Sequence, residues 1–153
     1  MPWNPRSGVL RRAAVLMAAA AWLGAVQVGP ASATVETFQT QITHTQSGKC
    51  LDASVSQGVR LVTCDGGTYQ QWIVSVSPSA TIKHVQSGKC LDASVSQGVR
   101  LVTCDGGTYQ QWSTNLPGYT VGHVQSGKCL DGSVSQGVRL VTCDGSNYQG
   151  WLF

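Results

Sequence analysis

Residues 46–72 read QSGKCLDASVSQGVRLVTCDGGTYQQW, and this stretch occurs three times in a chain of 153 residues. Residues 86–112 repeat it without a change. Residues 125–151 repeat it with four substitutions, which are Ala53 to Gly132, Gly67 to Ser146, Thr68 to Asn147 and Gln71 to Gly150. A period of about 40 residues is typical of one supersecondary unit used several times. We therefore expect three similar units that share one fold and one function.

Within each unit, short apolar runs alternate with turn residues. In the first unit the apolar runs are residues 42–44, 50–53, 59–63 and 72–74, and Gly, Ser and Asp stand between them. Short apolar runs bounded by such residues indicate β-strands. Beyond residue 33 no stretch of ten residues has the apolar period of 3.6 that an amphipathic helix needs. The sequence predicts an all-β fold with four short strands per unit.

Two short joins, residues 75–81 and 113–120, connect the units. Connections of this length are too short to separate independent domains. We predict one domain over residues 34–153, made of repeats at about 42–74, 82–113 and 121–153. Three units are too few for a propeller, which usually has four to eight blades, so a threefold barrel capped by hairpins fits the count better.

The first 33 residues have the pattern of an export signal. Three arginines precede an Ala-rich apolar run, and a small-residue site of the A-x-A type follows it. These parts are Arg6, Arg11 and Arg12, then residues 13–26, then residues 31–33. The run is shorter than the roughly 20 apolar residues that span a bilayer. We predict a signal peptide over residues 1–33, a secreted, extracellular product that begins at Thr34, and no membrane insertion after cleavage.

The charge of the whole chain is +3, from ten basic and seven acidic residues. Three of the basic residues and none of the acidic ones lie in the first 33 residues, so the rest of the chain is neutral. Its basic residues are spread over the repeats and form no cluster. A nucleic-acid partner is therefore not expected.

Each unit carries two cysteines, and an even number in an exported chain indicates disulfides. Two symmetric pairings are open: a bridge within each unit, or a bridge from the second cysteine of one unit to the first of the next. A bridge within a unit closes a loop of about 15 residues, which the chain-entropy model values at roughly 3 kcal/mol. The spacing lacks the paired short knuckles of zinc sites, so we predict no metal. The disulfide cysteines are Cys50, Cys64, Cys90, Cys104, Cys129 and Cys143.

Three segments of each unit resemble the repeat of the ricin-type β-trefoil lectins. In the first unit they are residues 48–52 (GKCLD), residues 59–64 with the second cysteine, and Gln70-Gln71-Trp72. They correspond to the C-L-D segment, the second cysteine and the Q-x-W of that family. Three copies in register make the resemblance specific, and it covers nearly all of the chain beyond residue 33. It implies a β-trefoil with one sugar pocket per repeat.

Within this family the repeat is most similar to that of the actinohivin-like lectins, small secreted lectins of three nearly identical repeats. That resemblance implies recognition of mannose at the ends of high-mannose glycans. It also implies that the aspartate of C-L-D and the tyrosine before Q-x-W contact the sugar. A carboxylate accepts charge-assisted hydrogen bonds from neighbouring hydroxyls, and a tyrosine supplies a stacking face and a hydroxyl. The predicted carbohydrate-binding residues are Asp52, Arg60, Val62, Asp65 and Tyr69, then Asp92, Arg100, Val102, Asp105 and Tyr109, then Asp131, Arg139, Val141, Asp144 and Tyr148.

The sequence departs from the actinohivin-like repeat at two of these positions. Arg60 stands where those lectins have a second tyrosine, and Asp65 stands where they have an asparagine. Many other members of the family have a stacking aromatic residue at Val62. The arginine brings five donors into the site. It could contact a sugar, favour an acidic sugar, or close the pocket through an ion pair with a carboxylate.

Other residues of the motif are expected to be structural. We predict core tryptophans at Trp72, Trp112 and Trp151, a structural amide at Gln70, Gln110 and Gln149, and hydrogen-bonded histidines at His44, His84 and His123. No nucleophile, base and orienting group can be assembled, so we predict no enzymatic activity and no cofactor.

The sequence thus favours a secreted, monomeric, trivalent lectin whose partners are glycans or polysaccharides. One alternative is a protein-binding trefoil such as a secreted protease inhibitor, because trefoils serve several functions. The other is a polysaccharide-targeting module that accompanies a glycoside hydrolase.

Overall fold

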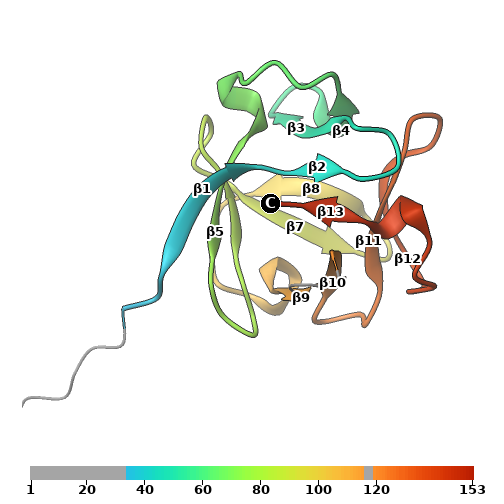
Figure 1. The fold of residues 1–153 in the computed structure, drawn as a ribbon. Coiled ribbons are helices and arrows are strands. Elements are labelled where there is room, and N and C mark those ends of the chain that lie inside the picture. Colours follow the sequence, from blue (N-terminus) through green and yellow to red (C-terminus); the bar gives the residue numbers. More distant parts are fainter. Residues whose placement is uncertain (1–33, 116–118) are drawn as a thin grey trace, which may run out of the picture. The chain divides into compact units, whose positions relative to one another are not determined.

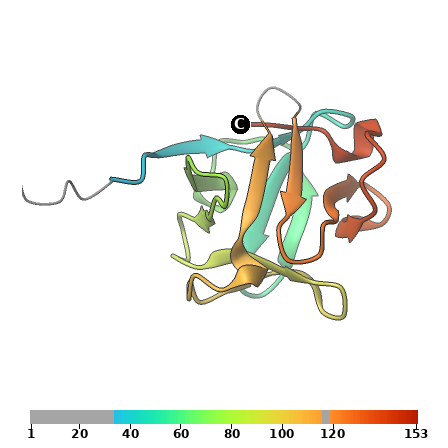
Figure 2. The ribbon, with the colours of Figure 1, turned by 90° about the horizontal axis from the view of Figure 1, so that it is seen from below.

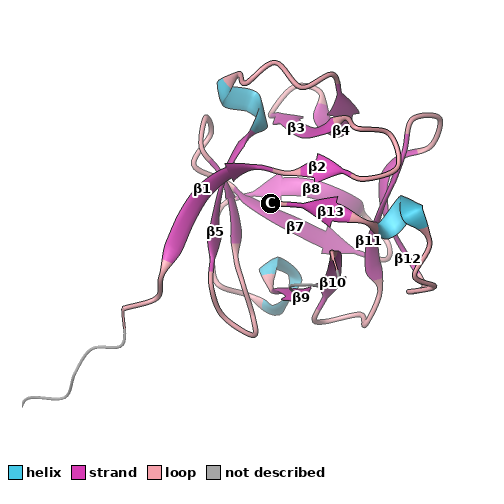
Figure 3. Cartoon of the chain, viewed as in Figure 1, coloured by secondary structure: helices cyan, strands magenta, loops and turns pink. Residues whose placement is uncertain are grey.

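The computed structural model describes residues 34–115 and 119–153. The predicted signal peptide lies outside the described residues, and so does part of the second join. The described chain is all-β, as predicted, with three short 3-10 turns between strands (Figures 1 and 3). The strands are β1 (Thr37–Gln41), β2 (Thr43–His44), β3 (Cys50–Ser54), β4 (Gly58–Val62), β5 (Gln71–Ser75), β6 (Ile82–His84), β7 (Cys90–Ser94), β8 (Gly98–Val102), β9 (Trp112–Asn115), β10 (Thr120–His123), β11 (Cys129–Ser133), β12 (Gly137–Val141) and β13 (Trp151–Leu152). The turns are η1 (Thr68–Gln70), η2 (Thr108–Gln110) and η3 (Asn147–Gln149).

Each repeat contains one tight hairpin, formed by β3–β4, β7–β8 and β11–β12. Side chains alternate between the two faces of a strand, so every second residue faces the core. In the first hairpin Leu51 and Ala53 are fully buried, and Leu61 packs against the same core cluster. The hairpin turn ends at Gly58, whose φ of 72° is one that residues with a Cβ rarely adopt. The second strands of the three hairpins, β4, β8 and β12, pack against one another. This contact joins the hairpins into a cap.

The remaining strands form the barrel. Around it, strand pairs within a repeat alternate with strand pairs between consecutive repeats. The last strand of each repeat pairs with the first strand of the next, as β5 with β6 and β9 with β10. The chain end completes the ring, because β13 pairs with β2 (Figures 1 and 2). In the first repeat β1 also pairs with β5. Isolated bridges Ala80–Trp112 and Thr120–Gly150 link the chain at the start and the end of the second and third repeats. This threefold arrangement is the predicted β-trefoil.

The core is one apolar cluster at the centre of the three repeats. Trp72, Trp112 and Trp151 are its largest side chains, and all three are fully buried, as predicted. A buried indole N–H needs an acceptor. The Nε1 atom of each donates to the carbonyl of the leucine in the C-L-D segment, as Trp72 does to Leu51 at 2.9 Å. In each repeat one hydrogen bond therefore links the tryptophan of Q-x-W to the leucine of C-L-D.

The disulfides form within each repeat. They join Cys50 to Cys64, Cys90 to Cys104 and Cys129 to Cys143, with 5.0 Å between the Cα atoms of each pair. The pairing between consecutive repeats is thereby excluded. Each bridge fastens the loop after the hairpin to the start of its first strand, so every repeat is closed on its own.

Candidate functional site

An ion pair lies on the outer face of every hairpin. Asp52 is directly opposite Arg60 in the β3–β4 register, and the two side chains point away from the core. The Nη2 atom of Arg60 lies 2.7 Å from Oδ1 of Asp52. The corresponding distances are 2.6 Å for Arg100 and Asp92, and 2.9 Å for Arg139 and Asp131. The sequence left three roles open for this arginine: contact with a sugar, preference for an acidic sugar, or an ion pair with a carboxylate. The ion pair is formed in all three repeats.

The pair is asymmetric in its exposure to solvent. The side chain of Asp52 is 6% exposed and that of Arg60 is 32% exposed, so the guanidinium covers the carboxylate. Oδ1 of Asp52 is buried and receives no hydrogen bond from the described residues in addition to this ion pair. Burial raises the pKa of the Asp52 carboxyl, and the positive charge of Arg60 opposes that rise. A ligand that approaches from solvent therefore meets the arginine first.

A shallow hollow lies beside the paired residues. In the first repeat it has a volume of about 270 Å³ and is lined by Ser54, Ser56, Gln57, Arg60 and Tyr69. The hydroxyls, amide and guanidinium are donors and acceptors for sugar hydroxyls, and the half-exposed tyrosine ring offers an apolar wall. The hairpin turn that supplies the serines and the glutamine was not among the predicted site residues. Its S-x-S-Q sequence between the aspartate and the arginine is the signal that could have identified it.

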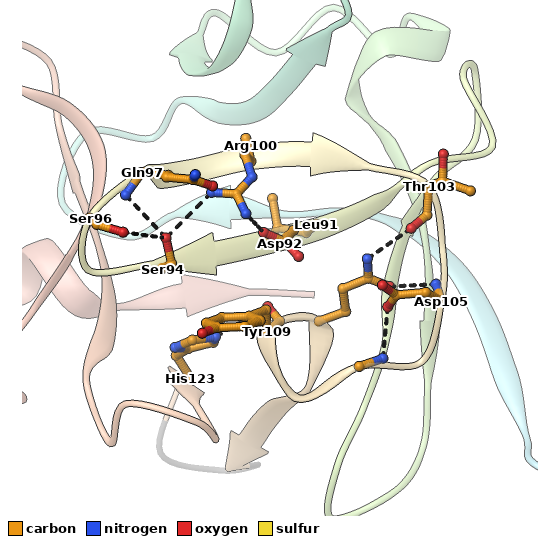
Figure 4. Close-up of polar contacts among 12 residues, drawn as sticks. Leu91, Asp92, Ser94, Ser96, Gln97, Arg100, Thr103, Asp105, Tyr109 and His123 are labelled. Carbon is orange, nitrogen blue, oxygen red and sulfur yellow. Dashed lines mark hydrogen bonds and ion pairs between the residues drawn. The ribbon is translucent and has the colours of Figure 1, made fainter.

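The third repeat has a related hollow, which shares the two turn serines and the tyrosine with the first and is lined by Ser133, Val134, Ser135 and Tyr148 together with Gln46. Gln46 belongs to the first repeat, so this hollow lies at a junction between repeats. In the second repeat Nη1 of Arg100 donates to Ser94 at 3.4 Å. Figure 4 shows the Asp92–Arg100 pair on the hairpin, with the Tyr109 ring below it.

The second aspartate of each repeat is used locally. Oδ1 of Asp65 accepts a hydrogen bond from the backbone N–H of Gly67 at 2.7 Å, and Asp105 and Asp144 make the same contact. This is an Asx turn, which shapes the loop before the 3-10 turn. Hydrogen bonds from Ser146 hold the pKa of the exposed Asp144 carboxyl below its usual range. In Figure 4, Asp105 lies beside Thr103 and is separated from the Asp92–Arg100 pair.

The predicted valines lie at the far end of the hairpin from its turn. Val62 pairs with Cys50 in the register, as Val102 does with Cys90 and Val141 with Cys129. All three valines are half-buried. They therefore sit next to the disulfide, and the hollows described above are lined by other residues.

The glutamine of Q-x-W holds the loop to the core, as predicted. Nε2 of Gln70 donates to the carbonyl of Thr63 at 2.9 Å, and its Oε1 accepts from the N–H of Asp65 at 3.0 Å. Gln110 and Gln149 repeat both contacts. The glutamine amide thus satisfies backbone groups of the loop before the tyrosine that have no backbone hydrogen-bond partner among the described residues.

The histidines are hydrogen-bonded, as predicted, and of the two positions left open, surface or core, they occupy the core. His44, His84 and His123 are at most 1% exposed. Burial lowers the pKa of each below 6.5, against a smaller opposing effect of a hydrogen bond to a tyrosine carbonyl. They are therefore neutral at pH 7.

A larger hollow lies away from the repeated motif. It has a volume of about 400 Å³, and its lining includes Phe38, Val74, Pro78 and Phe153. Most of this lining comes from the lead-in, the first join and the chain end, so it occurs once. Its polar lining consists of the hydroxyl residues Ser75, Ser77 and Thr114, with no charged or amide side chain. The hollows beside the repeated motif combine hydroxyls with an aromatic ring, which suits a sugar better.

Among residues 34–115 and 119–153, no group of three or more His, Cys, Asp or Glu side chains is placed to hold a metal ion. In the same part of the chain, no helix has the length and hydropathy required to cross a membrane.

Residues 38–151 match the family described as the ricin-type beta-trefoil lectin domain. The chain belongs to this family, and the domain is a carbohydrate-binding module. A comparison with curated protein sequences finds no match.

Several solved structures share the fold. The designed threefold-symmetric protein ThreeFoil is 27% identical, with a TM-score of 0.64 over 74% of this chain and 95% of ThreeFoil. The hemolytic lectin CEL-III is also 27% identical, with a TM-score of 0.64 over 76% of this chain and 30% of CEL-III. A non-toxic homologue of type II RIPs from Momordica charantia (bitter gourd), solved with α-methyl-D-galactoside, is 24% identical. Its TM-score is 0.66 over 76% of this chain and 48% of that protein. The chain thus spans less than half of the latter two.

Proposed function

We propose that the protein is a secreted lectin with three equivalent saccharide pockets, one on the hairpin of each repeat. The observation that carries this proposal is the repetition of one constellation: an exposed tyrosine ring, an Asp–Arg pair and a hydroxyl-rich turn, as in Tyr69, Arg60 and Ser54. Membership of a carbohydrate-binding family supports it. The domain acts by binding and performs no reaction of its own.

The pocket residues divide by exposure. Tyr69 supplies the apolar wall against the C–H face of a sugar ring, and the serines of the turn with Arg60 bond its hydroxyls. Asp52 lies beneath the guanidinium and fixes its orientation. This assignment makes Asp52 a support for Arg60.

Mannose-type glycans are the proposed ligands, on the resemblance of the repeat to the actinohivin-like lectins. A single shallow pocket with a Kd of about 1 mM contributes about 4 kcal/mol of binding free energy. Three pockets on one molecule raise the affinity for a multivalent surface by roughly 10² or more. Trivalence is what turns weak pockets into useful binding.

Immobilised yeast mannan tests the proposal. The wild-type chain should bind the mannan and be displaced by free mannobiose. Tyr69→Ala should weaken retention, and the variant with Tyr69, Tyr109 and Tyr148 all changed to Ala should lose it. An array of neutral and acidic glycans serves as a second surface. Absence of wild-type binding to every glycan on it would refute the proposed function.

Secretion is proposed from the first 33 residues and from the three disulfides, which are typical of oxidising compartments. Expression of the full chain in a secreting host, followed by mass spectrometry of the medium, tests this part. The expected product begins at Thr34. A product that keeps residues 1–33 and stays inside the cell would contradict it.

A further inference from the structure

Each histidine contacts the tyrosine of the preceding repeat. Nε2 of His84 lies 3.0 Å from the carbonyl oxygen of Tyr69, across the boundary between repeats 1 and 2. The same contact joins His123 to Tyr109 at 3.1 Å. It also joins His44 to Tyr148 at 3.1 Å, which connects the first repeat to the third. The three contacts therefore follow the ring of the barrel.

The hydrogen bonds fix one tautomer of each imidazole. A carbonyl can only accept, so Nε2 of His84 carries the proton and donates it to Tyr69. The other ring nitrogen, Nδ1, then accepts from the hydroxyl of Ser87 at 2.9 Å. That hydroxyl in turn accepts from the N–H of Lys89 at 3.3 Å. Both nitrogens are occupied, and the ring is held in place.

The imidazole also supports the pocket side chains. The rings of Tyr69 and His84 are stacked, with centroids 6.4 Å apart and planes 28° apart, and His84 packs on Trp72 at 5.0 Å. The Tyr109 and His123 rings repeat this stack, which Figure 4 shows (6.5 Å and 24°). The negative charge of Asp52 also acts on His84 and raises its pKa, against the larger opposite effect of burial. One face of the tyrosine ring is thus fixed from below.

We propose that each saccharide pocket is completed by the following repeat, with His84, His123 and His44 as positioning residues for Tyr69, Tyr109 and Tyr148. This inference rests on the proposed function. Gln46 supports it independently, since it lines the hollow of Tyr148 from the first repeat. The pockets are therefore junction sites: an isolated repeat contains no complete one, and the third depends on the contact between the first and last repeats.

The experiment isolates one pocket. Changing Tyr109 and Tyr148 to Ala leaves a protein in which only the Tyr69 pocket is intact, called the Tyr69-only protein. Its binding is followed by the shifts of the Tyr69 ring protons as mannobiose, galactose or xylose is added to about 10 mM, well above the Kd of about 1 mM expected for one pocket.

His84→Asn is the decisive change. Asn keeps an acceptor near the position of Nδ1 but is too short to reach the Tyr69 carbonyl. In the Tyr69-only protein it should weaken binding about 3- to 10-fold, the equivalent of one lost hydrogen bond. His84→Gln, which places a donor near the position of Nε2, should restore part of the affinity.

The same change at His44 or His123 is the matched control. All three histidines are equally buried and have equivalent hydrogen-bond partners, so the three variants should lose similar stability in urea. The tyrosines next to His44 and His123 have already been removed in this protein. Binding should therefore fall only for His84→Asn. An equal loss from all three changes, or a loss confined to His44→Asn, would overturn the inference. A Tyr69-only protein that binds none of the three sugars would contradict the proposed function, and the inference with it.

Discussion

At the scale of single residues, the Asp–Arg pair decides what the pocket presents to a ligand. Asp52 and Arg60 face each other because five residues of β3 pair in register with five of β4. The outer face of a two-stranded hairpin is exposed, yet the aspartate is buried because the longer arginine folds over it. A carboxylate in that position depends on its partner, since an unpaired buried charge is costly.

A double-mutant cycle measures this dependence. Arg60→Met leaves the buried carboxylate without its partner and should lower the free energy of unfolding by about 2 kcal/mol, whereas Asp52→Asn removes the buried charge and should lower it by about 1 kcal/mol. The double variant should lose less than the sum, with a coupling energy of about 0.5–1 kcal/mol. Urea unfolding monitors all four proteins. Strict additivity would show that the ion pair contributes nothing to folding.

The buried histidines predict how stability depends on pH. Burial lowers the pKa of His44, His84 and His123 in the folded protein, so the unfolded chain binds protons first as the pH falls through 6.5. The stability that the folded protein gains from burying neutral imidazoles is therefore present in full above that pH and is lost as the pH falls. The free energy of unfolding should decrease from about pH 7 to about pH 5. His84→Gln cannot titrate and should reduce the slope by about one third. A wild-type stability that is flat or rises over this range would be inconsistent with neutral buried imidazoles.

At the scale of elements, the 3-10 turn before Q-x-W carries the tyrosine, and one amide holds it. Gln70 is 1% exposed and bridges Thr63 and Asp65. Its neighbour Gln71 is half-buried at the start of β5, and its amide makes one hydrogen bond among the described residues, accepting from Nε2 of Gln39 at 3.3 Å. The two glutamines of one motif therefore have different roles.

Gln70→Ala tests this difference against Gln71→Ala. The first change leaves buried backbone groups of the loop without partners and should cost about 1–3 kcal/mol of unfolding free energy. The second should cost less than about 0.5 kcal/mol, as surface changes usually do. Chemical denaturation reports both. Equal effects would mean that the amide of Gln70 is dispensable.

The elements and the motif were predictable from sequence because local patterns determine them. Alternation fixes which residues of GVRLV face the core, and Gly, Ser and Asp mark the turns. The pairing of Arg60 with Asp52 could be foreseen only as one of three possibilities, because the side-chain geometry decides among them. The contact of His84 with Tyr69 could not be foreseen, since it depends on how consecutive repeats pack. Gln46 is a similar case, joined to Tyr148 only when the barrel closes.

At the scale of the whole molecule, the threefold symmetry is close but not complete. Ala53 and Ala93 lie on the core face of the first two hairpins, and the third has Gly132. A Cβ at Gly132 would lie 2.9 Å from Cη2 of Trp151 and 3.1 Å from Cδ1 of Leu61. Trp151 and Leu61 therefore occupy the space that the Cβ of an alanine would need in the third repeat.

Gly132→Ala, which makes the three C-L-D segments alike, tests how rigid that core is. Because a fully buried indole has little room to move, the change should lower the free energy of unfolding by about 1–2 kcal/mol. Thermal and urea unfolding would detect it. A stabilised variant would mean that the third repeat relaxes readily to the geometry of the other two.

The three pockets together form the central claim, and one titration tests it most directly. Tyrosine-labelled wild-type protein is titrated with mannobiose, with galactose and xylose in parallel, and the ring resonances of Tyr69, Tyr109 and Tyr148 are followed by NMR. All three should shift together with one sugar and give similar dissociation constants near 1 mM, an affinity of about 4 kcal/mol per pocket. Rings that stay unperturbed by every sugar, or a response that maps to the single apolar hollow at Phe38 and Phe153, would contradict the account.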